Sequence, residues 1–193
     1  MCYVALQLDK EMEAAKKKGR ENTVTREFVL PDYITTNTGY VKEPQADNEK
    51  DRGARPADGG DEQVLPLANE RFLVPEVLFS PSDVGITQAG VAEAVLQAVE
   101  ACPPDIQPLM TSSIILVGGS ACFPNFRERI HRDVRALIPQ GSQVNVHLPE
   151  DPVTYAWQGG SWFAADPNFP RYVVSAAEYR EHGPAVCHAR FLS

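Results

Sequence analysis

The sequence predicts an α/β fold, in which short strands alternate with helices along the chain. The clearest unit is a run of four aliphatic residues at 114–117 that is followed by the glycine pair Gly118-Gly119. Such a run is typical of a short buried strand that enters a sharp turn. Pro124 then stands where a helix is expected to begin. A strand, a glycine turn and a helix amino-terminus can together hold a phosphate or a nucleotide.

The composition is that of a folded chain with no membrane segment. Its 193 residues are 43% hydrophobic, which is enough for a packed core, and no apolar run reaches membrane-spanning length. The first apolar stretch, residues 3–8, is too short for a signal peptide. The formal net charge of −8 argues against direct, non-specific nucleic-acid binding. Attachment to chromatin through other proteins stays open, so any nucleosome contact is expected to be indirect.

The first third of the chain is predicted to form a helix, a strand and a polar insertion. Residues 5–18 read as a helix that ends in the basic run at 16–20, which we interpret as a solvated helix end rather than a localisation or anion patch. Residues 23–30 read as a strand. Residues 39–63 contain almost no apolar side chain and are predicted to be a disordered polar insertion after an ordered segment at 1–38.

Residues 64–150 are predicted to form the central subdomain, with the glycine turn inside it. A short helix is expected after Pro75 and another at about 87–102. The strand at 113–117 and a further helix follow, and then a strand at 143–148. On that further helix, charged side chains including Arg132 indicate an ordinary solvated face. Its opposite, apolar face carries Phe126, Ile130, Val134 and Leu137.

Residues 151–193 are predicted to form the carboxyl-terminal helices and a tail. A helix is expected to open at Pro152, followed by a strand at 172–174 and a short helix at 176–182. The pair Gly159-Gly160 lies inside the first helical pattern, where each glycine costs about 1 kcal/mol relative to alanine. We therefore expect another helix, or a nucleotide, to pack very close to this backbone.

No motif in the chain composes a catalytic centre or a metal site. The Walker lysine and the G-x-G-x-x-G and G-x-S-x-G patterns are absent, and the four cysteines and four histidines are dispersed. Cys122 lies beside the glycine turn but has no evident base, so we interpret it as a packing residue. Taken alone, Gly118-Gly119 is equally compatible with a tight turn and with ligand binding.

Several segments, taken in chain order, resemble the carboxyl-terminal half of the actin family. The resemblance covers nearly the whole chain except the insertion. It implies an actin-like α/β fold of the ribonuclease-H-like type, present here as an incomplete half. The segments are 2–6, 69–72, 75–76, 78–79, 117–120, 123–124, 155–161, 178–179, 183–184 and Phe191.

The resemblance implies a nucleotide site of which this chain holds only the adenine side. The residues that match the family's adenine contacts are Gly118, Gly119, Ser120 and Phe123. Val153 stands where conventional actin has a lysine that contacts the nucleotide. The family's phosphate loops, and the residue that positions the attacking water, belong to its other half. Because phosphoryl transfer needs metal-held phosphates and an oriented water, we expect no catalytic residue and no ATPase activity. ATP binding is expected only in a full-length protein.

The resemblance also implies partners. Trp162 and Phe163 match the cleft where family members receive amphipathic helices, and aromatic anchors suit such a groove. Both could instead be core residues. Asp83 occupies a loop tip that is apolar in actin filaments, so filament formation is disfavoured.

Residues 148–157 and 173–174 most resemble a nuclear branch of the family, found in the remodelling complex that installs a variant histone. We therefore expect a non-catalytic interaction subunit of that complex, in the nucleus with the cytoplasm as a second location. The alternatives are an ATP-hydrolysing actin-like protein of which this is a truncated record, and a cytoskeletal relative that polymerises.

Overall fold

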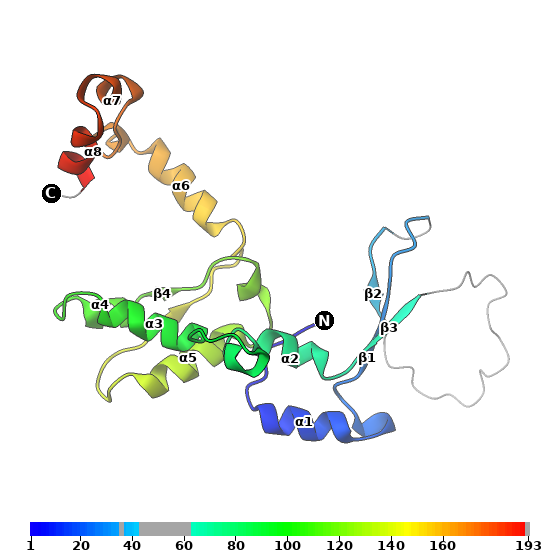
Figure 1. Ribbon diagram of the computed structural model, residues 1–193. Helices are drawn as coiled ribbons and strands as arrows, with labels where there is room; N and C mark the ends of the chain where they lie inside the picture. Colours follow the sequence, from blue (N-terminus) through cyan, green and yellow to red (C-terminus); the bar gives the residue numbers. More distant parts are fainter. Residues whose placement is uncertain (35–36, 43–62, 192–193) are drawn as a thin grey trace.

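Helices and short strands alternate along the chain in the computed structural model, which describes residues 1–34, 37–42 and 63–191 (Figure 1). The mixed α/β class predicted from the sequence is confirmed. The helices and strands are α1 (Leu8–Lys16), β1 (Arg26–Val29), β2 (Tyr40–Val41), β3 (Val64–Leu67), α2 (Glu70–Glu76), α3 (Val91–Glu100), α4 (Gln107–Thr111), β4 (Ile114–Ile115), α5 (Phe126–Leu137), β5 (Val146–His147), α6 (Tyr155–Ala165), α7 (Ala176–His182) and α8 (Pro184–Phe191).

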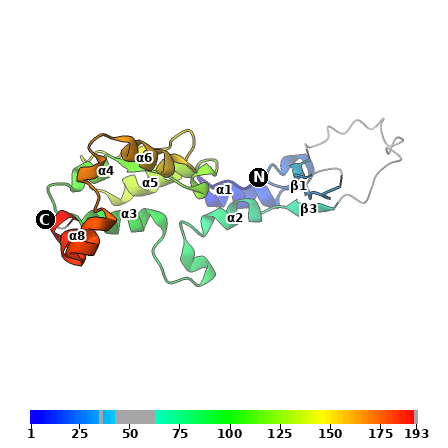
Figure 2. The same cartoon turned by 90° about the horizontal axis from the view of Figure 1, so that it is seen from above.

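The described residues after the first six form three parts. We call residues 7–34, 37–42 and 63–76 the sheet lobe, residues 77–152 the core lobe, and residues 153–191 the terminal arm. Figure 2 shows the strands of the sheet lobe at one end of the molecule and the core lobe at the other, with α1 and α2 between them. The terminal arm begins with α6, which leads away from the core lobe toward α7 and α8 (Figure 1).

The sheet lobe carries an antiparallel sheet in the order β2-β1-β3. Phe28 of β1 lies between Val41 of β2 and Leu65 of β3. Pro66 lies in β3, an edge strand, where a residue without an N–H group is tolerated and discourages further pairing. Tyr40 and Val41 belong to this sheet although 39–63 is predicted to be the insertion; residues 43–62 lie outside the described residues.

The helix that was expected to follow Pro75 instead begins before this proline and ends just after it. Helix α2 ends at Glu76 and contains Pro75 in its last turn. Proline cannot donate to the carbonyl four residues earlier, which belongs to Arg71. The backbone N–H of Tyr3 donates to that Arg71 carbonyl at 2.9 Å. A partner distant in sequence thus satisfies the group that the proline leaves free, and the helix can extend to the proline.

The core lobe is a strand–helix–strand unit covered by α3. Strand β4 pairs in parallel with β5, with Ile114 opposite Val146, and α5 makes the crossover between them. Phe126, Ile130 and Val134 are buried on one face of α5, as the periodicity predicts. Leu137 is exposed, because the chain leaves the helix there and turns Ile138 inward instead.

The terminal arm differs most from the sequence expectations. Residues 172–174, predicted as a strand, form no strand; they follow the 3-10 helix η4 (Phe169–Arg171). Residues after Gly183, predicted as a tail, form α8, which has a proline at its first position. Helix α7 starts at the predicted place with a capping box, in which Ser175 and Glu178 bond each other's backbone N–H groups. Among the described residues, no helix is both long and apolar enough to cross a membrane.

The capping box makes the arm sensitive to acid. The Ser175 N–H donates to Glu178 at 2.7 Å and Arg190 of α8 donates to it at 2.9 Å. These bonds lower the pKa of Glu178 from 4.5 to about 2. A lowered pKa means that the carboxylate stabilises the arm fully above pH 4.5, and that this stabilisation is lost as the pH falls toward about 2.

We therefore expect the amide signals of α7 and α8 to change in this acid window, as followed by NMR. A Glu178→Gln variant should lack that transition, because the amide carries no titrating charge. The matched variant Glu181→Gln, at an exposed neighbouring position, should keep it. Equal profiles for Glu178→Gln and the parent protein would contradict this assignment.

Candidate nucleotide and partner sites

The glycine turn follows β4 directly and has a backbone that only glycine adopts readily. Gly118 has φ 94° and ψ 172°, and its N–H donates to the carbonyl of Pro152 at 2.7 Å. This bond joins the turn to the loop after β5. Gly119 begins the 3-10 helix η3 (Gly119–Cys122), and a Cβ built on either glycine would meet nothing within 4 Å. The turn is therefore open on its outer side.

A pocket of about 350 Å³ lies beside this turn. Phe123 lines it and also packs against the core cluster, by which we mean the buried side chains around Ile130 and Val134. Its ring is therefore held in place from behind. The charged side chains in the lining are Arg127, Glu128 and Glu150. The Arg127 guanidinium already donates to the carbonyl of Val146 at 2.8 Å. The pocket thus offers an aromatic surface, two carboxylates and one guanidinium.

The loop before α6 satisfies its own backbone N–H groups. The carboxylate of Asp151 accepts from the N–H groups of Val153 and Thr154, at 3.1 and 3.2 Å, and from the Thr154 hydroxyl. The hydroxyl bond and then the backbone bonds lower the pKa of Asp151. The backbone N–H groups of Val153 and Thr154 are therefore already bonded within the loop.

Replacing Gly118 with alanine is expected to destabilise the turn by about 1–3 kcal/mol, because a residue with a Cβ is strained at this φ and ψ. Gly119→Ala is the matched control, since Gly119 has no left-handed φ and the same open surroundings. Its change should stay within about 1 kcal/mol. Denaturant unfolding of the two variants measures the difference; equal losses would show that the conformation of Gly118 is not what the turn requires.

The predicted partner residues lie on a different element. Trp162 is 71% exposed and Phe163 is 48% exposed, both on α6, so neither is a core residue among the described residues. Phe163 packs edge-on against Phe169, with ring centroids 5.3 Å apart, and also contacts Tyr172. Phe163 thus supports the next turn, whereas Trp162 is presented to solvent.

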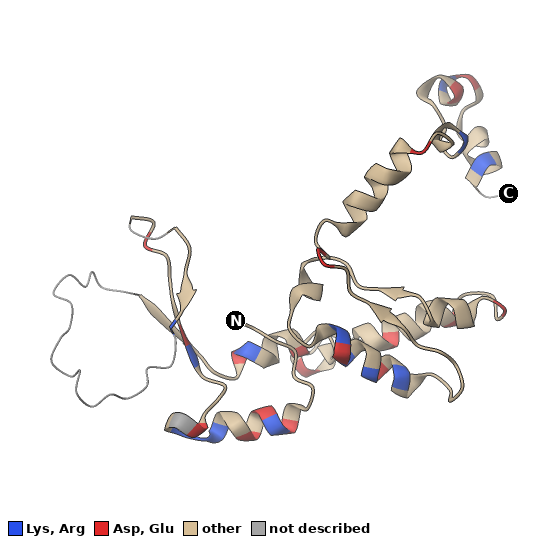
Figure 3. Ribbon diagram, turned by 180° about the vertical axis from the view of Figure 1, so that it is seen from behind, with Lys and Arg blue, Asp and Glu red and all other residues tan. Residues whose placement is uncertain are grey.

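Helix α6 carries neither charge nor buried face. It contains no Lys, Arg, Asp or Glu and is tan along its whole length, whereas α1 and α5 carry both signs of charge (Figure 3). Nothing in the described part of the chain lies within 4 Å of a Cβ at Gly159 or Gly160. The close approach expected at this pair is therefore not made by these residues. An exposed helix without charges is typical of a surface that is covered, either by another protein or by further parts of a longer chain.

A second hollow of about 610 Å³ lies between α7, α8 and the residues before them. Sequence reasoning missed it, because the segment after Gly183 was predicted as a tail. The available signal was the spacing of Cys187 and Phe191, four residues apart on one helix face. The lining residues are Tyr172, Val173, Val174, Ser175, Ala176, Tyr179, Arg180, Cys187 and Phe191.

The structure thus places the predicted site residues in two groups. Gly118, Gly119, Ser120 and Phe123 share one turn of the core lobe, and Trp162 and Phe163 belong to the arm that leads away from it (Figure 1). In the described ranges, no group of three or more His, Cys, Asp or Glu side chains could hold a metal ion. The four cysteines are free thiols.

Comparison with known proteins gives one consistent result. The actin family profile matches residues 1–192. Actin-related protein 6 of Drosophila melanogaster is 41% identical over 183 residues, which is 95% of this chain and 44% of that protein. Actin-related protein 6 of Arabidopsis thaliana is 40% identical over 206 residues, covering 100% of this chain and 48% of the relative. Actin-like protein ARP6 of Yarrowia lipolytica is 35% identical over 191 residues, which is 99% and 46% respectively. The chain spans about half the length of these relatives.

Proposed function

The chain belongs to the actin family, and from that premise we propose that it is part of a non-catalytic structural subunit of a nuclear chromatin-remodelling complex that exchanges a variant histone. It is similar to proteins named actin-related protein 6 over nearly all of its length. Its mixed helices and strands form an actin-like half domain. The nucleus is the location that this role requires, and the cytoplasm is a second one.

The observation that carries the proposal is helix α6. An uncharged helix with three exposed aromatic side chains, Trp157, Trp162 and Phe163, is costly to leave in water. Aromatic residues are also the usual anchors of protein interfaces. The relatives are about twice as long as this chain, so either the rest of a longer protein or a partner covers this helix. We propose that protein subunits of the complex cover it. The net charge of −8 favours a contact with nucleosomes that is indirect, through those subunits.

The proposal is tested by replacing Trp162 with alanine in the full-length protein and purifying its complex. Loss of an interface anchor typically weakens binding by about tenfold or more. Tyr33→Ala is the matched control, because Tyr33 is an equally exposed aromatic residue on the sheet lobe. Partner subunits should be lost from the Trp162→Ala preparation and retained in the control. Unchanged assembly of Trp162→Ala would remove this residue as an anchor.

We further propose that the protein does not hydrolyse ATP. The turn at Gly118–Phe123 can support a base, and the pocket beside it presents the carboxylates of Glu128 and Glu150 against one guanidinium, Arg127, which already donates to the Val146 carbonyl. Any ATP binding is a property of the full-length protein. Saturable ATP turnover by the pure full-length protein, abolished by a substitution at Gly119, would overturn this proposal.

Filament formation is the competing role within the family, and Asp83 opposes it. This carboxylate lies on the exposed 3-10 helix η2 (Pro81–Val84), where an apolar contact would have to bury it without a partner. We expect the full-length protein to remain in the supernatant in sedimentation assays with and without ATP. Pelleting that depends on ATP would instead favour a cytoskeletal relative.

A further inference from the structure

The first six residues run between the two lobes and contribute to both hydrophobic clusters. The amino-terminus lies between the sheet lobe and the core lobe in both views (Figures 1 and 2). Val4 is fully buried in the core cluster with Ile130, whereas its neighbour Ala5 is fully buried with Val24 and Phe72. Successive side chains of an extended segment point in opposite directions. One segment therefore joins two separate clusters.

On the side of the sheet lobe, Arg71 of α2 holds this segment. Its carbonyl accepts from the Tyr3 N–H at 2.9 Å, and its guanidinium donates to the Met1 carbonyl at 2.9 Å. The Tyr3 hydroxyl donates to Glu11 of α1 at 2.6 Å. Burial and then this hydrogen bond raise the pKa of Tyr3 to about 12, so the phenol stays protonated as a donor.

On the side of the core lobe, successive backbone groups are bonded in the same way. The Val4 N–H donates to the Pro124 carbonyl at 3.0 Å, and the Asn125 side chain donates to the Val4 carbonyl at 3.2 Å. Arg129 of α5 donates to the Ala5 carbonyl at 2.8 Å. Arg132, one turn further along α5, donates to the Leu6 carbonyl. Residues 1–6 belong to no strand, yet their backbone is bonded from both lobes.

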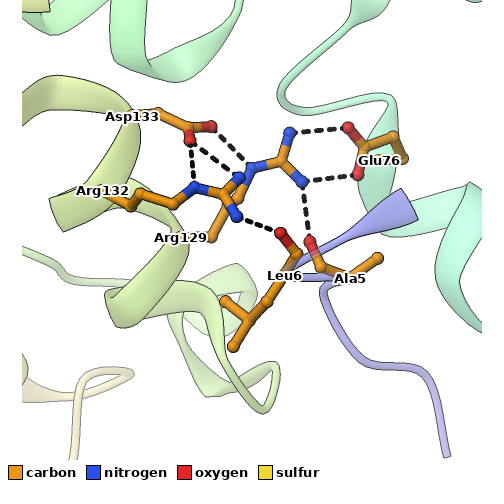
Figure 4. Close-up of polar contacts among 6 residues, drawn as sticks. All are labelled: Ala5, Leu6, Glu76, Arg129, Arg132 and Asp133. Atoms are coloured by element: carbon orange, nitrogen blue, oxygen red, sulfur yellow. Dashed lines mark hydrogen bonds and ion pairs between the residues drawn. The ribbon is translucent and has the colours of Figure 1, made fainter. Parts of the chain in front are cut away.

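Arg129 is where these contacts meet (Figure 4). Besides the Ala5 carbonyl, its guanidinium donates to both carboxylate oxygens of Glu76, at 2.8 and 2.9 Å, and to Asp133 at 2.6 Å. It also lies over the ring of Phe79, 4.5 Å from its centre. The side chains of Arg129 and Glu76 are only 11% and 6% exposed. Burial alone would lower the pKa of Arg129, but its bonds to Glu76 and Asp133 raise it, so the charge is kept.

We propose that residues 1–6 are a strap that fixes the sheet lobe against the core lobe, and that Arg129 is the positioning residue that locks the strap. Glu76 is the last residue of α2, in the sheet lobe, and Arg129 lies on α5, in the core lobe. One planar guanidinium therefore ties α2, α5 and the strap together. Without this lock, the chain that continues from α2 toward Leu78 still joins the two lobes covalently, and it can act as a hinge.

The test is hydrogen exchange of individual amides in the intact full-length protein. Removing Arg129 alone would leave Glu76 buried without its partner, so the variant that tests the lock is Glu76→Leu with Arg129→Met, which removes both charges. Loss of charge-assisted bonds should speed exchange of the Tyr3 and Val4 amides by about tenfold or more. The amides of Ile130 and Val134, inside α5, should keep their protection.

Two further variants separate positioning from general stability. Arg127→Met changes an arginine of the same helix that bonds Val146 rather than the strap, and it should leave the Tyr3 and Val4 amides protected. Arg129→Lys keeps a charge beside Glu76, but an ammonium cannot span Glu76, Asp133 and Ala5 together. Its strap amides should exchange at an intermediate rate. Unchanged strap amides in the double variant would overturn the proposal, as would equal acceleration throughout both lobes.

Discussion

Replacing Ile130 with alanine is expected to lower the free energy of unfolding by about 2–5 kcal/mol. Ile130 is fully buried and lies on the apolar face of α5, against the parallel strands and α3. Three carbons would be removed from a site that helix and strands enclose on all sides. The surroundings cannot close that space without moving α5, so the cost combines lost burial and a cavity.

The measurement is denaturant unfolding of the intact protein, with the change seen as a lower midpoint at an unchanged slope. Ile115→Ala is the matched control, because this isoleucine of β4 is 49% exposed. The control should lose about 1 kcal/mol or less, mostly through strand propensity. A similar loss for both variants would show that the α5 face is not the centre of the core lobe.

The part of the fold that could be predicted from the sequence is the part set by local patterns. The strand before Gly118, the turn itself and the buried face of α5 follow from periodicity and from glycine chemistry, and the structure confirms them. The strand was also expected to be buried, but Ile115 and Val117 are 49% and 50% exposed. The parallel pairing of β4 with β5 follows from the helix that connects them. The family resemblance is confirmed by the match over residues 1–192.

The features of the fold that could not be predicted depend on hydrogen bonds between residues that are distant in sequence. Helix α2 extends to Pro75 because Tyr3, some seventy positions away, satisfies the Arg71 carbonyl. Arg132 lies on the solvated face, as predicted, with its side chain 48% exposed, and its bond to the Leu6 carbonyl could not be predicted. For Arg129 the sequence shows only the spacing to Asp133, four residues along the same helix, because its other partners, Ala5 and Glu76, come from distant segments. Periodicity places a side chain on a helix face and cannot identify the backbone that passes over that face.

The candidate sites, too, have features that could be predicted from the sequence and features that could not. The residues of the glycine turn are adjacent in sequence, so their proximity could be predicted. Whether the backbone N–H groups of Val153 and Thr154 are free could not be predicted, because that depends on the rotamer of Asp151. The aromatic character of α6 could be read from its sequence, but its exposure depends on what the rest of the fold covers. The exposure of α6, learned only from the structure, directs the proposal toward protein binding.

Replacing Phe72 with alanine is expected to be as damaging as the change at Ile130, but in the other lobe. Phe72 is fully buried on α2 in the cluster with Ala5 and Val24, and its ring contacts Tyr3 with centroids 6.2 Å apart. Removing a buried phenylalanine ring costs about 3–5 kcal/mol. Since this cluster is small and separate from the core cluster, few other side chains can fill the space.

The decisive measurement is hydrogen exchange of individual amides, which shows in which lobe the amides lose their protection. In the Phe72→Ala variant, amides of α1 and β1 should exchange faster while those of Ile130 and Val134 are less affected, because the two clusters share no buried side chain among the described residues and are joined by the neighbours Val4 and Ala5. Phe191→Ala, at an exposed phenylalanine of α8, is the matched control and should alter neither lobe. If Phe72→Ala instead weakened both lobes equally, the two clusters would behave as one cooperative unit, and the strap would serve to merge the lobes rather than to position them.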